Sequence, residues 1–232
     1  MRADGIRAVL LDALGTLVDL VPPWPALVRE LAARGVTVSE AHAREAMLAE
    51  MAYYRVHHAQ AGDAAALAEL RARCARVLGE ALGEPVRGLG PAELLAAMMA
   101  SLRFVAYPEA DGVLRELRAR GVRLVVVSNW DVSLHEVLAR TGLAALLDGA
   151  VTSAELGAAK PASAIFAAAL ELAGGVAPGE ALHAGDSVEA DVAGARAAGL
   201  RAVLVRRGDD ASPHPEGVRT IASLDGLLDE VS

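Results

Sequence analysis

Short, continuous apolar runs recur along the chain, once near its start and repeatedly after residue 120. A run that is apolar at every position favours a strand buried on both faces, as in a parallel sheet. Longer segments with helical spacing of their apolar residues separate these runs. The predicted strands cover 8–11, 122–128, 149–153, 181–185 and 201–205, and the predicted helices cover 108–120, 134–140, 162–173, 188–198 and 223–231. This alternation predicts βαβ units and a parallel sheet with right-handed crossovers.

Residues 24–102 have a different pattern, because no strand-like run interrupts them. Ala, Leu, Glu and Arg dominate there, and these residue types favour helices. Ser39 is a good N-cap candidate for the second of the expected helices, which cover 24–34, 40–60, 63–83 and 91–102. The predicted fold class is therefore α/β, a Rossmann-like parallel sheet core of residues 1–17 and 103–232 with an inserted all-helical cap of residues 18–102. Such a cap can move over the carboxyl edge of the sheet as a lid, and residues 209–217 are expected to form a polar loop.

The composition narrows the choice of function. Of the 232 residues, 54% are hydrophobic and 22% are charged, which is typical of a packed globular core. The net charge of −8, without a basic block, argues against nucleic-acid binding. An uninterrupted apolar run of about 18 residues is missing, so we expect no membrane-spanning helix. The first residues lack a signal-peptide pattern and Cys74 is the one cysteine, so we expect a cytoplasmic protein without a disulfide framework.

Polar residues gather where the predicted strands end. In a parallel sheet the carboxyl ends of the strands are neighbours, and ligands bind at that edge. A carboxylate buried there is costly unless a cation meets it, and a metal ion is the obvious candidate. We expect the following residues to converge on one pocket: Asp12 after the first strand, Ser128 and Asn129 after the second, Lys160 after the third, and Asp186 and Asp191 after the fourth.

The stretch D-A-L-G-T-L at residues 12–17 resembles the first motif of the haloacid-dehalogenase-like hydrolase superfamily, D-x-D-G-T-L. The polar groups at the later strand ends agree with this resemblance, which covers the whole chain. The resemblance implies a Mg²⁺-dependent phosphatase of a small phosphorylated metabolite, acting through an aspartyl-phosphate on Asp12. It also implies a monomer or a homodimer whose cap sets the choice of substrate.

The same resemblance implies a role for each site residue. Asp12 is the nucleophile, and Lys160 supplies the fixed positive charge that neutralises phosphoryl oxygens. Hard oxygen ligands suit Mg²⁺. The implied metal ligands are Asp12, Asp186 and the backbone carbonyl of Leu14, and the phosphate-binding groups are Ser128 and the backbone of Asn129. Thr16 stabilises the turn after Asp12, and Asp191 orients the metal shell or the lysine.

Leu14 is the one departure from the family pattern, because most phosphatases of the family have a second aspartate there as general acid and base. Loss of such a proton transfer costs about 10²–10⁴-fold in rate. The enzyme could prefer leaving groups that need little protonation, such as acyl phosphates or phenolates, or it could be a poor phosphatase. Another group could also supply the proton, and the candidates are His57, His58, Glu155 and Asp131.

Two other functions stay open. Metal-independent 2-haloacid dehalogenases also lack the second aspartate, because a leaving halide takes no proton. Asp186 and Asp191 argue against this function, since a metal-free enzyme does not need both acids, and Ser128-Asn129-Trp130-Asp131 resembles a phosphatase-like subgroup instead. A non-catalytic binding or regulatory protein on the same fold is the third possibility, against which the retained site residues argue.

Overall fold

The computed structural model describes residues 5–208 and 216–231. Most of the predicted polar loop at 209–217 therefore lies outside the described residues. The chain divides into two compact units, one formed by the chain up to Asp19 and from Ala106 onward, the other by Leu20–Val105. None of the helices in the described ranges has the length and apolar character of a membrane span.

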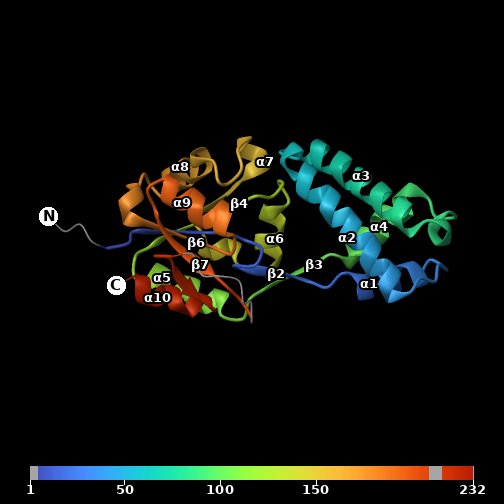
Figure 1. Ribbon diagram of the computed structural model, residues 1–232, viewed down its shortest axis with the longest axis horizontal. Helices are drawn as coiled ribbons and strands as arrows, with labels where there is room; N and C mark the ends of the chain where they lie inside the picture. The colour runs from blue at the N-terminus through green and yellow to red at the C-terminus, as the bar shows by residue number, and fades with distance from the viewer. Residues whose placement is uncertain (1–4, 209–215, 232) are drawn as a thin grey trace. The chain divides into compact units, whose positions relative to one another are not determined.

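The first unit is built on a six-stranded sheet with strand order β5-β4-β1-β6-β7-β8, in which all strand pairs are parallel (Figure 1). The central strand β1 is buried throughout, and its last residue, Leu11, lies beside Val126 on one side and Ala184 on the other. The predicted Rossmann-like α/β core is confirmed. The strands are β1 (Ala8–Leu11), β4 (Arg123–Ser128), β5 (Gly149–Thr152), β6 (Ala181–Gly185), β7 (Arg201–Val205) and β8 (Arg219–Ile221).

Helices cover both faces of this sheet, with α8 and α9 on one side and α5 and α10 on the other (Figure 1). Ala8 and Leu10 of β1 pack with Ile165 and Phe166 of α8, so alternate residues of the strand serve the two faces. The α-helices of this unit are α5 (Ala110–Ala119), α6 (Leu134–Arg140), α7 (Ser153–Leu156), α8 (Ser163–Leu172), α9 (Gly194–Ala197) and α10 (Leu227–Glu230). Its 3₁₀ turns are η3 (Ala144–Leu146), η4 (Pro178–Glu180) and η6 (Leu224–Gly226).

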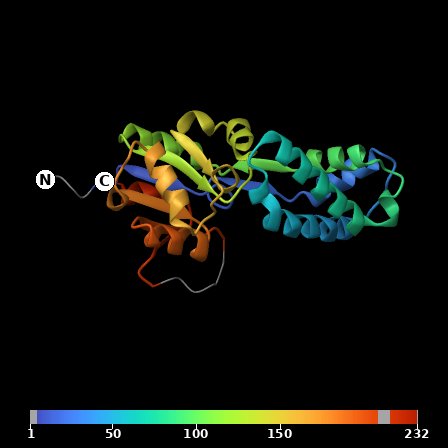
Figure 2. The same ribbon diagram turned by 90° about the horizontal axis from the view of Figure 1, so that it is seen from above.

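The second unit contains the four helices predicted for this part of the chain. Helix α2 packs along α3, and α1 packs against α4, as both views show (Figures 1 and 2). The hydroxyl of Ser39 accepts a hydrogen bond from the His42 amide at 3.2 Å, which confirms the predicted N-cap. The elements are α1 (Trp24–Ala32), α2 (Glu40–His57), η1 (His58–Gln60), α3 (Ala64–Leu82), η2 (Glu84–Val86) and α4 (Pro91–Ser101).

A two-stranded sheet of β2 (Val18–Val21) and β3 (Arg103–Ala106) corrects the prediction of an all-helical insertion at 18–102, because β2 lies within that range and β3 follows it directly. Each strand has only four residues and includes a charged one, Asp19 in β2 and Arg103 in β3, so neither is an uninterrupted apolar run. Each also finds its partner across the whole insertion, so the pairing is a tertiary effect. A second correction concerns 188–198, which is a π-helix, η5 (Val188–Ala193), followed by α9.

Candidate active site

Asp12 lies directly after β1 and is 6% exposed. Its amide donates a hydrogen bond to the carbonyl of Ala184 at 2.9 Å, which extends the pairing of β1 with β6 by one residue. The carboxylate oxygen Oδ1 accepts hydrogen bonds from the hydroxyl of Ser128 at 2.9 Å and from Nζ of Lys160 at 2.6 Å. The structure therefore brings together three of the predicted site residues, from three different strand ends.

Lys160 is buried between two carboxylates. Its Nζ lies 2.6 Å from Oδ1 of Asp12 and 2.6 Å from Oδ1 of Asp191. Burial alone would lower the pKa of Lys160, but the charges of the two carboxylates outweigh burial and raise it. The ammonium is therefore held charged beside Asp12.

Asn129 fixes the backbone of Lys160. The side-chain amide of Asn129 donates to the carbonyl of Lys160 at 3.0 Å, and its oxygen accepts from the amide of Lys160 at 2.7 Å. The sequence assigned a backbone role to Asn129 and did not foresee this pairing. These two hydrogen bonds hold both the amide and the carbonyl of the Lys160 backbone. They therefore fix the point from which the Lys160 side chain extends toward Asp12.

Asp191 is held from three sides. Oδ1 lies 2.8 Å from Nε2 of His183 and also accepts from Lys160, and Oδ2 accepts from the amide of Ser187 at 2.9 Å. Burial would raise the pKa of Asp191, but the hydrogen bond with His183 and the charge of Lys160 hold it below its usual range. Asp191 is thus an ionised partner of Lys160.

His183 is the site residue that the sequence did not identify. It lies fully buried in β6, with Phe166 edge-on to its ring at a centroid distance of 5.1 Å. Its Nδ1 is buried and has no hydrogen-bond partner among the described residues. We therefore assign the ring proton to Nε2, from which it is donated to Asp191.

The π-helix η5 explains how Asp191 reaches back to the end of β6. The carbonyl of Ser187 accepts hydrogen bonds from the amides of both Asp191 and Val192, at 3.0 and 3.1 Å, which widens this turn beyond an α-helix. A Cβ at Gly185 would collide with the carboxyl of Asp191, so only glycine fits at that position. The segment predicted as a regular helix is therefore shaped around one carboxylate.

Asp186 completes a cluster of acids at this edge of the sheet. Ligand oxygens of Asp12, Asp186 and Asp191 all lie within 4.8 Å of one another. Asp186 is exposed at the surface of the site, yet the protein around its carboxyl and the charges of Asp12 and Asp191 raise its pKa to about 6. Three carboxylates face one lysine, so the cluster lacks positive charge.

The turn after Asp12 is closed by backbone hydrogen bonds. The carbonyl of Ala13 accepts from the amides of Leu17 and Val18, at 2.8 and 2.9 Å. Gly15 has a φ of 78°, and a Cβ there would meet a carboxylate oxygen of Asp186, so glycine is required twice over. The Leu14 side chain is 43% exposed. Thr16 is fully buried, and its hydroxyl has no hydrogen-bond partner within the described ranges.

The proposed alternative proton sources have other contacts. Oδ1 of Asp131 accepts from the amide of Ser133 at 2.7 Å, as in a local turn. Glu155 binds Nε2 of His135 and the hydroxyl of Thr152, both at 2.8 Å.

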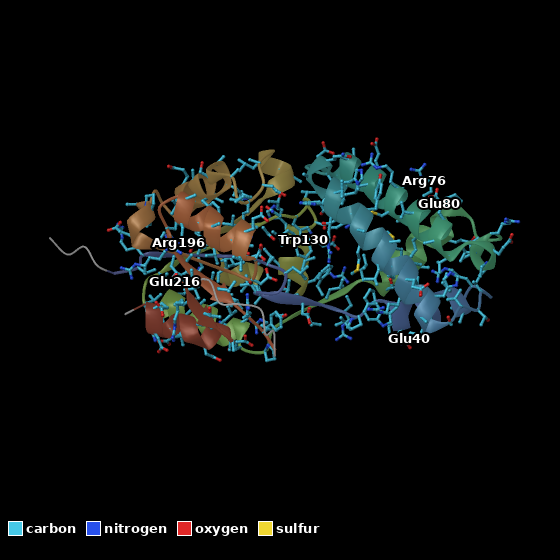
Figure 3. The ribbon with its side chains drawn as sticks, in the orientation of Figure 1. Glu40, Arg76, Glu80, Trp130, Arg196 and Glu216 are labelled. Atoms are coloured by element: carbon cyan, nitrogen blue, oxygen red, sulfur yellow. The ribbon has the colours of Figure 1, made fainter. Side chains whose placement is uncertain are left out.

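In the helical unit, Nδ1 of His57 lies 2.8 Å from the carbonyl of Tyr53, and Nδ1 of His58 lies 3.0 Å from the carbonyl of Arg55. In the first unit, Trp130, labelled in Figure 3, is buried just beyond β4, and its indole donates to Ser133 at 3.3 Å. The contacts of Asp131, Glu155, His57 and His58 favour none of these four residues as the source of the catalytic proton.

The parallel sheet and the buried acid–lysine centre at its carboxyl edge define a Rossmann-like α/β protein with a charged candidate active site. The model of one family, haloacid dehalogenase-like hydrolase, matches residues 6–199. The chain therefore belongs to the haloacid dehalogenase-like hydrolase family.

Curated relatives include phosphatases. The chain is 43% identical over 132 residues to a phosphoserine phosphatase of Thermus thermophilus, covering 56% of this chain and 52% of that protein. It is 35% identical over 135 residues to a ribulose-1,5-bisphosphate 5-phosphatase of Halopiger xanaduensis, covering 54% and 56% respectively. The chain spans about half the length of the curated relatives it matches.

Solved structures of both chemistries share the fold. A HAD phosphatase from Thermococcus onnurineus is 26% identical, with a TM-score of 0.63 over 97% of each chain. A 2-haloacid dehalogenase from Pseudomonas syringae is 24% identical, with a TM-score of 0.61 over 97% of each chain. The second likeness concerns the fold alone, so the choice of reaction depends on the site.

Proposed function

We propose that this protein is a Mg²⁺-dependent phosphatase of a small phosphorylated metabolite, and that Asp12 is its nucleophile. One observation carries the proposal: Oδ1 of the buried Asp12 accepts hydrogen bonds from both Lys160 and Ser128, within 4.8 Å of ligand oxygens of two further carboxylates. A carboxylate, a fixed ammonium, a hydroxyl and an acid cluster are the parts that phosphoryl transfer needs. The phosphatases among the relatives support the same reaction.

In the first step an oxygen of the Asp12 carboxylate attacks phosphorus and forms the aspartyl-phosphate. The bond from phosphorus to the ester oxygen breaks, and its electron pair leaves with that oxygen. Lys160 and Ser128, which donate to Asp12 in the free protein, are placed to donate to the phosphoryl oxygens instead. In the second step water attacks phosphorus, loses a proton, and releases phosphate and the Asp12 carboxylate.

The donor set fits a magnesium ion. Asp12, Asp186 and the backbone carbonyl of Leu14 would hold it, since hard oxygen ligands suit Mg²⁺. Three carboxylates against one ammonium leave two negative charges, and burial together with the charges of Asp12 and Asp191 raises the pKa of Asp186. When bound, the ion would offset the repulsion between these carboxylates and an anionic substrate. Both oxygens of Asp191 already accept hydrogen bonds, so we assign Asp191 to positioning Lys160.

Leu14 points to the class of leaving group. Its side chain cannot protonate a departing oxygen. Substrates whose leaving group is stable as an anion, such as acyl phosphates and aryl phosphates, avoid this requirement. We therefore infer that such substrates react faster than alkyl phosphates. The predicted cytoplasmic location and the monomeric or homodimeric state stay predictions.

A 2-haloacid dehalogenase is the second candidate, and Leu14 is the observation that favours it. In that reaction an oxygen of Asp12 would attack carbon, and the halide would leave with the bonding electrons and no proton. Asp186 argues against it, because its carboxylate clusters with those of Asp12 and Asp191 within 4.8 Å, and a metal-free reaction has no use for such a cluster of acids. A third candidate, a binding protein on the same scaffold, would hold the metal without turnover.

Hydrolysis of p-nitrophenyl phosphate and acetyl phosphate, each with Mg²⁺ and with EDTA, tests the proposal. We expect metal-dependent release that Asp12→Asn abolishes. Asp111→Asn, a substitution of the same kind on the exposed face of α5, should retain it. A phosphorylated peptide that contains Asp12 should be trapped when the reaction is quenched with acid. Turnover with neither substrate would refute the phosphatase, and release of halide from 2-chloropropionate without metal would establish the dehalogenase.

A further inference from the structure

The guanidinium of Arg207 binds the turn that follows Asp12. Arg207 lies two residues beyond the end of β7, at the carboxyl edge of the sheet. Its Nε donates to the carbonyl of Gly15 at 3.1 Å, and its Nη2 donates to the carbonyl of Thr16 at 2.8 Å. The planar fork of an arginine can hold two adjacent acceptors in this way, whereas a lysine cannot.

The other side of the same guanidinium is also fixed. Nη1 of Arg207 lies 2.7 Å from a carboxylate oxygen of Glu109, and these two side chains are only 19% and 16% exposed. The guanidinium carbon lies 3.4 Å from the centroid of the Tyr107 ring, in a cation–π stack. The amide of Tyr107 in turn donates to the carbonyl of Leu17 at 3.0 Å. Arg207 therefore joins the turn to the segment between β3 and α5.

Backbone hydrogen bonds close the turn, but its own side chains add little support. Gly15 has no side chain, Leu14 is 43% exposed and apolar, and the hydroxyl of Thr16 has no hydrogen-bond partner within the described residues. Yet the turn begins at the proposed nucleophile, carries the Leu14 carbonyl and packs Gly15 against the carboxyl of Asp186. A shift of the turn would therefore move several parts of the site together.

We propose that Arg207 is a positioning residue of this enzyme, which holds the turn after Asp12 in its reactive shape through the carbonyls of Gly15 and Thr16. This inference rests on the proposed function for its catalytic consequence. Its structural part, that the fork of Arg207 holds the turn, is independent of the reaction. Misplacement of reacting groups by about 1 Å can cost about 10²-fold in rate, so loss of the fork should lower kcat more than it raises KM.

The test compares Arg207→Met and Arg207→Lys with Arg201→Met, which removes an exposed arginine at the opposite end of the same strand. Hydrogen exchange is followed at the turn amides of Gly15, Leu17 and Val18 and at the amides of β6. Mn²⁺ binding is measured by calorimetry, and kcat and KM are measured with p-nitrophenyl phosphate. Glu109→Gln is the second variant in case Arg207→Met does not fold, because it loosens the guanidinium without removing it.

We expect Arg207→Met to speed exchange at the turn and not in β6, to weaken Mn²⁺ binding, and to lower kcat by about tenfold or more. Arg207→Lys should behave similarly, since a lysine ammonium cannot bridge both carbonyls, and Arg201→Met should match the wild type. Unchanged exchange at the turn, or an equal increase in β6, would overturn the inference, because Arg207 would then have no role or only a general stabilising one. Failure of the wild type to hydrolyse phosphate esters would remove the proposed function alone, since the exchange measurement still decides the role of Arg207.

Discussion

Replacing Leu14 with aspartate would give this site the proton donor that most phosphatases of the family carry. The position tolerates a polar side chain, because the hydrogen bonds that close the turn run between backbone groups of Ala13, Gly15, Leu17 and Val18. Complete burial of a leucine stabilises a protein by about 1.5–3 kcal/mol. Since Leu14 is 43% exposed, we expect Leu14→Asp to cost about 1 kcal/mol of unfolding free energy.

The catalytic gain should be larger than this loss and should depend on the leaving group. A general acid contributes about 10²–10⁴-fold, which corresponds to about 2.7–5.5 kcal/mol of barrier. An alkyl phosphate should gain an amount in that range, because its alkoxide needs a proton. The new carboxyl would join Asp12, Asp186 and Asp191, and their charges would raise its pKa. It would therefore be protonated over more of the pH range, as the acid step requires.

The assay is the ratio of kcat/KM for glycerol phosphate to that for p-nitrophenyl phosphate at saturating Mg²⁺. We expect Leu14→Asp to raise this ratio by at least about tenfold, because the aryl ester needs little protonation. Leu14→Asn has almost the same shape but no transferable proton, so it should leave the ratio unchanged. An equal effect of the two variants, or no change with aspartate, would refute the idea that a missing proton donor limits this site.

Two further predictions concern the charges around Asp12. Lys160→Met should lower the unfolding free energy in urea by about 3–5 kcal/mol above pH 7, because it leaves buried carboxylates without their cation; Arg123→Met, which breaks the more exposed pair with Asp148, should cost much less. The pKa of Asp186 is about 6 in the folded protein against an ordinary 3.8, so the folded state binds this proton more tightly and its contribution to stability is lost as pH rises from about 4 through 6. In EDTA, Asp186→Asn should therefore raise the urea midpoint of unfolding above pH 7 and leave it unchanged below about pH 4. Excess Mg²⁺ should remove the gain in stability above pH 7. A higher midpoint at both pH values would show that the gain does not come from the ionisation of Asp186.

Much of the core could be predicted because its strands need no partner to be recognised. Each buried strand is mostly apolar, as in the run 124–127 of the second strand, and the helices between the strands are amphipathic or rich in alanine. Once the sheet is known to be parallel, the strand ends must meet at one edge. For that reason alone Asp12, Ser128 and Lys160 could be expected near one another, although 116 and 148 residues separate the last two from Asp12.

The errors occur where a tertiary contact decides the local structure. Strands β2 and β3 exist because they pair with each other, and four residues of either sequence carry no clear pattern. The π-helix at Val188–Ala193 differs from an α-helix by one extra residue in a turn, which hydrophobic spacing over six residues cannot resolve. Within this turn Asp191 reaches back to Lys160 and to His183 of β6.

His183 and Arg207 show two different limits on predicting site residues from the sequence. A histidine inside an otherwise apolar strand is itself an indication, because a buried imidazole needs a polar partner, and the nearby Asp191 could have been proposed as that partner. Arg207 gives no such indication, since it follows a strand as many surface arginines do, and the carbonyls it binds lie 191 and 192 residues away. The first motif contains Asp12, the proposed nucleophile, and Gly15, but neither Leu14 nor Thr16 provides a polar side-chain contact that would hold their turn in place. Backbone hydrogen bonds close this turn, so any further side-chain support has to come from another part of the chain, and Arg207, which follows another strand end, is placed to give it.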